Sequence, residues 1–253
     1  MTALVRAELR KLFSTRLWLW LLLGALGFTA LACVFTIVGE RSPQNPSPPL
    51  STEAGLHNLF ATAATGSVFA IVLGAVGMTS EFRHLTATPT FLASPHRGRV
   101  VVAKLITYAM VGVGYGLACA GLVLAIALPW LPARGISLSP TGHGIPAVLL
   151  AAVAAVAIYA VVGVGVGALV RNQIAAIVGT LIYLFVLEAI LATVPKVRDY
   201  YRYFPGGAAN SLTRAGTGQV TLLEPWQGGL LLLGYGLVFA TLGTLLAVRR
   251  DVT

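Results

Sequence analysis

Charged residues are scarce in this chain, and their scarcity is the first constraint on its class. Only 10% of its 253 residues are charged, whereas 57% are hydrophobic, and the mean hydropathy is +0.85. A soluble domain carries roughly a quarter charged residues, so this chain has too few to cover a water-facing surface. We therefore expect lipid to be the solvent for most of it. Cysteine is also rare, because Cys33 and Cys119 are the only two, and neither has the spacing of a metal site or a redox pair.

The sequence also lacks the motifs of an enzyme. It has no GxxxxGK[ST] phosphate loop, no HExxH zinc motif, no pair of aspartates in an apolar run and no serine with an evident histidine partner. The histidines lie far apart, at or beyond the edges of the apolar runs. We therefore predict that the chain is not an enzyme, has no metal site and binds no cofactor directly.

The net charge of +9 does not indicate a nucleic-acid partner. The 17 basic residues lie in short clusters beside apolar runs, where they set topology and contact lipid headgroups. We predict membrane lipid, and no nucleic acid, as the partner of these clusters.

Long apolar runs are what the chain has in place of charge. A helix needs about 20 apolar residues to cross the hydrocarbon core of a bilayer, and continuous rather than alternating runs favour helices over a barrel. The sequence predicts an all-α membrane protein that forms one transmembrane domain with six spans, at residues 17–38, 59–79, 105–130, 145–170, 174–194 and 228–248. Glycines four residues apart in two of these spans, Gly112 and Gly116 and then Gly163 and Gly167, predict close helix packing.

Basic residues in the connections predict the orientation. If the N-terminus is cytoplasmic, the cytoplasmic segments hold eleven of the 17 lysines and arginines, and the external ones hold six. Positive charge favours the cytoplasmic side, so we predict that both termini are inside.

The segment before the first span, residues 1–16, is amphipathic. Val5, Leu9, Leu12 and Phe13 share one helical face, and Arg10 and Lys11 lie outside it. This pattern favours a basic helix that lies in the membrane interface. An ordinary basic flank that only sets topology is the alternative.

The second connection, residues 80–104, has the most specific pattern in the chain. It begins with an acid and a base, Glu81 and Arg83, and continues as a threonine-rich stretch with an apolar tip at Phe91 and Leu92. A turn at Ser94-Pro95, two arginines and a lysine follow. A short helix with an exposed apolar tip between charged ends is typical of a docking element for a cytosolic partner.

These features resemble the permease subunits of type-2 ABC exporters, especially the short actinobacterial form. The second span of that family ends in Glu-x-Arg, followed by a threonine, a Leu-Ala-x-Pro turn, an arginine and a lysine. The matching residues occur here in the same order: Glu81, Arg83, Thr86 or Thr88, Leu92-Ala93, Pro95, Arg97 and Lys104. The N-terminal helix and the span count match as well, so the resemblance covers essentially the whole chain. One departure is His84-Leu85, where the family often has a glycine.

The resemblance implies a multi-pass protein of the bacterial plasma membrane that forms the substrate pathway of an exporter as a dimer. It implies a second permease chain, identical or related, and two copies of a cytosolic ATPase that holds the ATP and Mg²⁺. The residues expected to couple the chain to that ATPase are Glu81, Phe82, Arg83, Thr86, Phe91, Leu92, Pro95 and Arg97.

Two features lie toward the outer side. Glu188 is an acid well inside a predicted span, and such groups are often functional. It either lines the translocation path, where it would contact a cation or a proton, or it is a structural acid that pairs with Lys196 or Arg198 or is hydrogen-bonded. In the connection 195–227, the resemblance implies short re-entrant helices and an external gate at Tyr203, Phe204 and Pro205. An interfacial aromatic belt is the alternative.

Two other functions remain open on the sequence alone. A stand-alone secondary transporter or channel would need internal repeats or several intramembrane charges, and Glu188 is the one acid well inside a predicted span. A non-transporting anchor or sensor subunit is the third alternative. The substrate is not indicated by any pattern in the sequence.

Overall fold

The chain folds into helices over all the ranges that the structure, a computed structural model, describes: residues 1–40, 47–83, 97–136, 144–216 and 221–249. No strand occurs within those ranges. The helices are α1 (Thr2–Phe13), α2 (Leu17–Gly39), α3 (Glu53–Ala61), η1 (Thr62–Gly66), α4 (Ser67–Arg83), α6 (Arg97–Ala133), α7 (Ile145–Val170), α8 (Gln173–Ile182), η2 (Tyr183–Leu187), α9 (Glu188–Thr193), η3 (Arg198–Tyr203), α10 (Pro205–Thr213) and α11 (Pro225–Arg249).

Six helical segments are long and apolar enough to cross a membrane, which confirms the predicted all-α, six-span fold. They are Leu17–Gly39, Glu53–Glu81, Gly98–Ala133, Ile145–Val170, Gln173–Thr193 and Pro225–Gly243. The second combines α3, η1 and α4, and the fifth combines α8, η2 and α9. The second begins six residues before the predicted start at residue 59, because the polar start of α3 continues directly into the apolar run.

The second span changes from α to 3₁₀ geometry where threonines and a serine dilute its apolar run. The Thr62 hydroxyl donates to the Leu59 carbonyl, and the Thr65 hydroxyl donates to the Thr62 carbonyl. Hydroxyls that bond to a preceding carbonyl compete with the regular helix ladder. The η1 segment is the local result of this competition.

Helix α7 is the centre of the bundle and packs against α4, α6 and α11. Its glycines permit this, because a Cβ on Gly163 would collide with the backbone carbonyl of Ile71 in α4. A Cβ on Gly112 of α6 would come within 2.7 Å of the Cα of Ala157 in α7. The predicted role of these glycines in close helix packing is confirmed.

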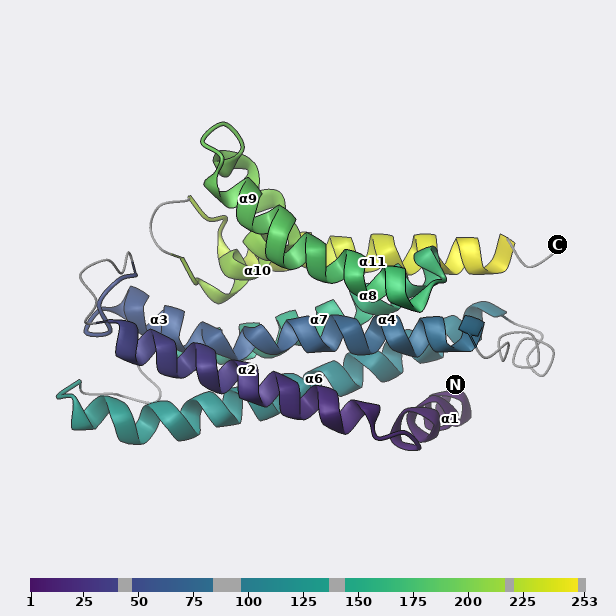
Figure 1. Cartoon of the computed structure of the whole chain (residues 1–253), viewed down its shortest axis with the longest axis horizontal. Coiled ribbons are helices and arrows are strands. Elements are labelled where there is room, and N and C mark those ends of the chain that lie inside the picture. Colours follow the sequence, from purple (N-terminus) through teal and green to yellow (C-terminus); the bar gives the residue numbers. More distant parts are fainter. Residues whose placement is uncertain (41–46, 84–96, 137–143, 217–220, 250–253) are drawn as a thin grey trace.

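The bundle has two distinct ends (Figure 1). Helix α1, the end of α4, the start of α6 and the described end of α11 lie at one end. Helices α3, α9 and α10 lie at the other end, where the fifth span leans away from the bundle. Helix α1 and the described end of α11 therefore lie on the same side, as an even number of crossings requires. That this side faces the cytoplasm stays a prediction from the basic residues.

Large apolar side chains cover the outer faces of α2 and α8. Phe35 is 72% exposed on α2, and Ile174 is 75% exposed on α8. Water would penalise these surfaces, whereas lipid or another apolar helix would not.

Candidate functional site

Helix α1 uses the apolar face that the sequence predicts, but it also buries an acid there. Leu12 is buried, and Val5 and Leu9 are partly buried. Phe13 is half-exposed at the end of the helix and packs edge-on against Trp18, with 5.0 Å between the ring centres. Glu8 is only 5% exposed, so the face of α1 that contacts the bundle carries a carboxylate.

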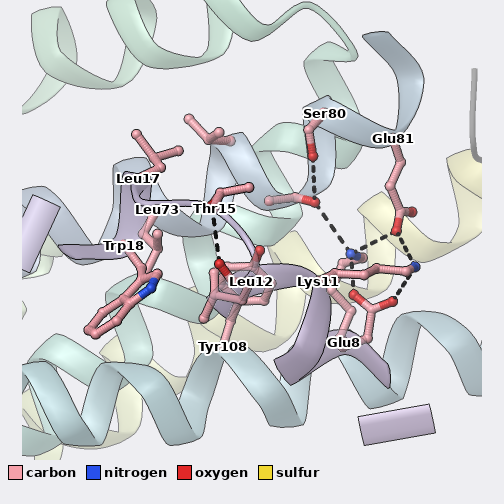
Figure 2. Close-up of a pocket in the computed structure, with 13 residues that line it drawn as sticks. Glu8, Lys11, Leu12, Thr15, Leu17, Trp18, Leu73, Ser80, Glu81 and Tyr108 are labelled. Atoms are coloured by element: carbon pink, nitrogen blue, oxygen red, sulfur yellow. Dashed lines mark hydrogen bonds and ion pairs between the residues drawn. The ribbon is translucent and has the colours of Figure 1, made fainter. Parts of the chain in front are cut away.

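Four charged side chains meet at this point, and we call Glu8, Lys11, Glu81 and Lys104 the charge cluster. Lys104 Nζ lies 2.5 Å from Glu8 Oε2 and 3.0 Å from Glu81 Oε1. Lys11 Nζ lies 2.7 Å from Glu8 Oε1 and 3.2 Å from Glu81 Oε1. Figure 2 shows Glu8, Lys11 and Glu81 turned toward one another from two helices. Each acid therefore contacts both bases.

The charge cluster is electrically balanced and mostly buried. The side chains of Lys104, Glu8 and Glu81 are 3%, 6% and 9% exposed, whereas that of Lys11 is 48% exposed. Burial by itself would raise the pKa of Glu8, but the attraction and hydrogen bonds of Lys104 and Lys11 outweigh it, and the pKa is lowered. Burial opposes the charge of Lys11 in the same way, yet its carboxylate partners raise its pKa. Both groups are thus held in their charged forms.

The charge cluster joins three helices around one connection. Glu8 and Lys11 come from α1, Glu81 from the last turn of α4, and Lys104 from the beginning of α6. Among the described helices α6 follows α4, so Glu81 and Lys104 flank the connection between them. Lys104 Nζ also donates to the Gly77 carbonyl at 3.3 Å. The two flanks of the connection and the N-terminal helix are therefore held together by ion pairs.

A cavity of about 380 Å³ adjoins the charge cluster. Leu12, Trp18, Leu73 and Tyr108 form part of its lining, so it lies between α1, α2, α4 and α6 (Figure 2). The Tyr115 hydroxyl of α6 donates to the Trp18 carbonyl at the start of α2. The junction between α1 and the first span is thereby tied to the third span.

The structure describes only part of the predicted coupling residues. Glu81 lies in the charge cluster. Phe82 and Arg83 lie in α4, and Arg97 begins α6, but their side chains are not among the described ones. Thr86, Phe91, Leu92 and Pro95 lie outside the described residues.

Sequence reasoning missed that Glu8, Lys11 and Lys104 meet Glu81. It considered Glu81 only with its neighbour Arg83. The sequence did indicate that Glu8 is unusual. Glu8 lies three residues after Val5 and four before Leu12, so it places an acid on the apolar face of the helix. The pairing itself joins residues 96 positions apart, and no local pattern indicates that.

Glu188 lies at the other end of the bundle and is 6% exposed. Its Oε1 accepts a hydrogen bond of 2.9 Å from the Gly206 N–H, in the first turn of α10. The Tyr183 hydroxyl also bonds to this carboxylate. Lys196 and Arg198 are both exposed, and no ion pair joins Glu188 to a basic side chain in the described part of the chain.

The predicted gate residues surround the start of α10. Phe204 is the residue before the helix, and Pro205 is its first residue. Tyr203 is 44% exposed, and its carbonyl accepts a hydrogen bond of 2.7 Å from the Tyr235 hydroxyl of α11. Helix α10 packs against α7 and α11. The connection 195–227 thus contains a 3₁₀ segment and a short helix that contact the spans.

Tyr201 completes the polar surroundings of Glu188. Burial and the charge of Glu188 raise the pKa of Tyr201 to about 12. Its hydroxyl therefore stays protonated near neutral pH, and it accepts a hydrogen bond of 3.3 Å from the Asn210 amide.

Among the described residues, no group of three or more histidine, cysteine, aspartate or glutamate side chains could hold a metal ion. No protein-family model matches the chain, and no curated protein matches it significantly. Fold and composition together define the class: a multi-pass, α-helical integral membrane protein.

Proposed function

We propose that this chain is the membrane-spanning permease subunit of an ATP-driven exporter, coupled to a separate cytosolic ATPase. In this proposal the chain forms the substrate pathway as a dimer in a bacterial plasma membrane. The single observation that carries the proposal is the charge cluster, because it ties both flanks of the connection between α4 and α6 to the N-terminal helix.

The mechanical argument starts from the cost of separating buried charges. A force applied to the connection reaches Glu81 at one flank and Lys104 at the other. Removing either from its partners would leave a buried charge uncompensated, at a cost of about 3–5 kcal/mol. The flanks and α1 are therefore expected to move as one unit and to transmit the motion to the second and third spans. An ATPase docked on the connection would act through this unit.

The chemistry of ATP hydrolysis must come from another chain in this proposal. The sequence has no phosphate-binding GxxxxGK[ST] motif. Its apolar spans and short connections suit a pathway instead. ATP and Mg²⁺ would be bound by the partner, in two copies for a permease dimer.

Co-expression tests the proposal. The chain is produced together with the ATPase encoded by a reading frame that flanks its gene, and the complex is purified through a tag on the permease. We expect an equimolar complex in which ATP hydrolysis depends on the permease and drives transport in proteoliposomes. Transport by the purified chain without any ATPase would overturn the proposal and favour a secondary transporter or channel. A chain that binds no ATPase and transports nothing would be an anchor or sensor subunit.

The Phe91→Ala variant tests the coupling connection itself. We expect it to retain ATP hydrolysis in the complex but to lower ATP-driven transport about tenfold, since loss of a buried aromatic contact at an interface costs about 1.4 kcal/mol or more. The matched control is Phe35→Ala, which removes the same side chain from an exposed position on α2. Normal transport by the Phe91→Ala variant would show that the connection is not the coupling element.

A further inference from the structure

Two cavities near the fifth span share part of their lining and differ in character. One, of about 250 Å³, is lined by polar groups that include Ser67, Glu188, Tyr201 and Asn210. The other, of about 420 Å³, is apolar and opens between α7, α8 and α11. Tyr159 and Leu184 line both cavities. These shared residues place the two cavities side by side, and we call them the polar end and the apolar end of a composite site.

The polar end contains the carboxyl group of Glu188 and an unused hydrogen-bonding group. The Glu188 carboxyl accepts a hydrogen bond from the Gly206 N–H in the first turn of α10, and a cation bound beside it would stabilise its ionised form. The Ser67 hydroxyl is buried, with its residue 7% exposed, and has no hydrogen-bond partner among the described residues. A buried polar atom without a partner is unusual in a native protein, and here it points to a ligand.

The apolar end is lined by aromatic rings as well as aliphatic side chains. The rings belong to Tyr159, Tyr183, Phe204, Tyr235 and Phe239. Aromatic faces attract cations, and such rings are used to recognise quaternary ammonium groups. The aliphatic side chains of this lining also favour burial of an apolar group. This end therefore suits the apolar body of a cation.

A π-helical turn builds the junction between the two ends. Segment η2 spans Tyr183–Leu187, and the Glu188 N–H bonds to the Tyr183 carbonyl five residues back. In an α-helix, residues five apart point to different sides, whereas the wider π turn brings them nearly into line. The Tyr183 hydroxyl can therefore reach the Glu188 carboxylate. Single π turns of this kind occur frequently at functional sites.

We propose that this composite site binds a lipophilic monovalent cation, with its charge beside Glu188 and its apolar body between α7, α8 and α11. No described basic residue lines either cavity. Lys196 and Arg198 are exposed, and the Arg202 guanidinium lies over the Tyr203 ring at 4.9 Å. The site therefore offers no counter-charge for an anion or for the phosphate of a zwitterionic lipid. The binding of the cation does not depend on the proposed function. The further statement that this cation is the exported substrate rests on the proposed function.

Two probes of the same shape and opposite charge test the proposal: tetraphenylphosphonium and tetraphenylborate. Binding is measured by equilibrium dialysis on the purified chain, without any ATPase, in nanodiscs of fixed lipid composition. With each probe measured alone, we expect saturable binding of the phosphonium and no saturable binding of the borate. Glu188→Gln should weaken binding of the phosphonium about tenfold or more, because the amide leaves no negative charge to attract the cation. The matched control, Glu224→Gln, removes an exposed acid just before α11 and should leave binding unchanged.

A second variant tests the apolar end independently. A Cβ on Gly179 of α8 would meet no atom within 4 Å, and Gly179 lines the apolar cavity. Gly179→Phe should fill this space and abolish binding of the phosphonium while the chain stays folded by circular dichroism. If the Glu188→Gln variant does not fold, binding of the phosphonium by the Gly179→Phe variant decides whether the proposal holds. Unchanged binding in either folded variant, or equal binding of the borate, would overturn the proposal. Because no ATPase is present, that failure would leave the proposed export function intact.

Discussion

Replacement of Lys104 by methionine is expected to lower the free energy of unfolding by about 3–5 kcal/mol, the largest effect of any single change in the charge cluster. Lys104 is the common partner of Glu8 and Glu81, at 2.5 Å and 3.0 Å. Methionine has nearly the same length but no charge, so two largely buried carboxylates would share the half-exposed Lys11 alone. The measurement is thermal unfolding of the purified chain in one detergent, followed by tryptophan fluorescence.

The matched control is Lys11→Met in the same charge cluster. Lys11 contacts the same two acids, but its side chain is 48% exposed, and exposed pairs contribute about 0.2–1 kcal/mol. Its replacement should therefore cost far less. Equal losses in the two variants would contradict the view that burial of Lys104 makes the difference.

The pH dependence of the Lys104→Met variant should have the opposite sign to that of the parent chain. In the parent, the pKa of Glu8 is lowered, so its stabilising contribution is present above its ordinary pKa and is lost as the pH falls through the lowered value. Without Lys104, burial of Glu8 is less opposed and its pKa rises. Acidification from about pH 7 to about pH 5 should therefore stabilise the variant and not the parent. Destabilisation of both over this range would contradict this account of the charge cluster.

Replacement of Gly163 by valine should separate the two most central helices. A Cβ at Gly163 would collide with the Ile71 carbonyl of α4, and a backbone atom cannot move aside as a flexible side chain can. Overpacking of a core costs typically about 1–3 kcal/mol and occasionally more, and here the whole α4–α7 contact must shift. We expect a large loss of the monodisperse fraction in size-exclusion chromatography together with a lower unfolding temperature.

Gly112 and Gly114 provide an internal comparison within one helix. A Cβ on Gly112 would come within 2.7 Å of the Ala157 Cα, whereas a Cβ on Gly114 would meet no atom within 4 Å. Gly112→Val should behave like Gly163→Val, and Gly114→Val should keep the unfolding temperature of the parent chain. A loss at Gly114 as large as that at Gly112 would contradict the view that interhelical contact sets the cost, since valine has a higher helix propensity than glycine.

The sequence predicted the spans well, because each is a long run of one chemical character. The fourth span was predicted at residues 145–170, and α7 has those same bounds. The second was harder, since Thr62 and Thr65 interrupt its apolar run and their hydroxyls bond to carbonyls three residues earlier in the chain. The π turn in the fifth span had no signal, because the run 183–187 is apolar throughout.

The candidate sites depend on contacts that no local pattern encodes. Glu81 was recognised, but its partners Lys11 and Lys104 were not, since which charges meet depends on how α1 packs against α4 and α6. Likewise, Glu188 was recognised as a buried acid, but Ser67 and Gly206 were not expected beside it. They come from α4 and α10, and only the packing of these helices places them there.

The amino-acid sequence by itself determined that this chain is an integral membrane protein with six spans and an amphipathic helix before the first of them. These properties follow from hydropathy and helical periodicity, which are sums over neighbouring residues. Only the tertiary structure decided that Glu8, Lys11, Glu81 and Lys104 form one charge cluster and that Glu188 lines a cavity together with Ser67. Buried charges act only through the partners around them, and in this chain those partners come from helices far apart in the sequence.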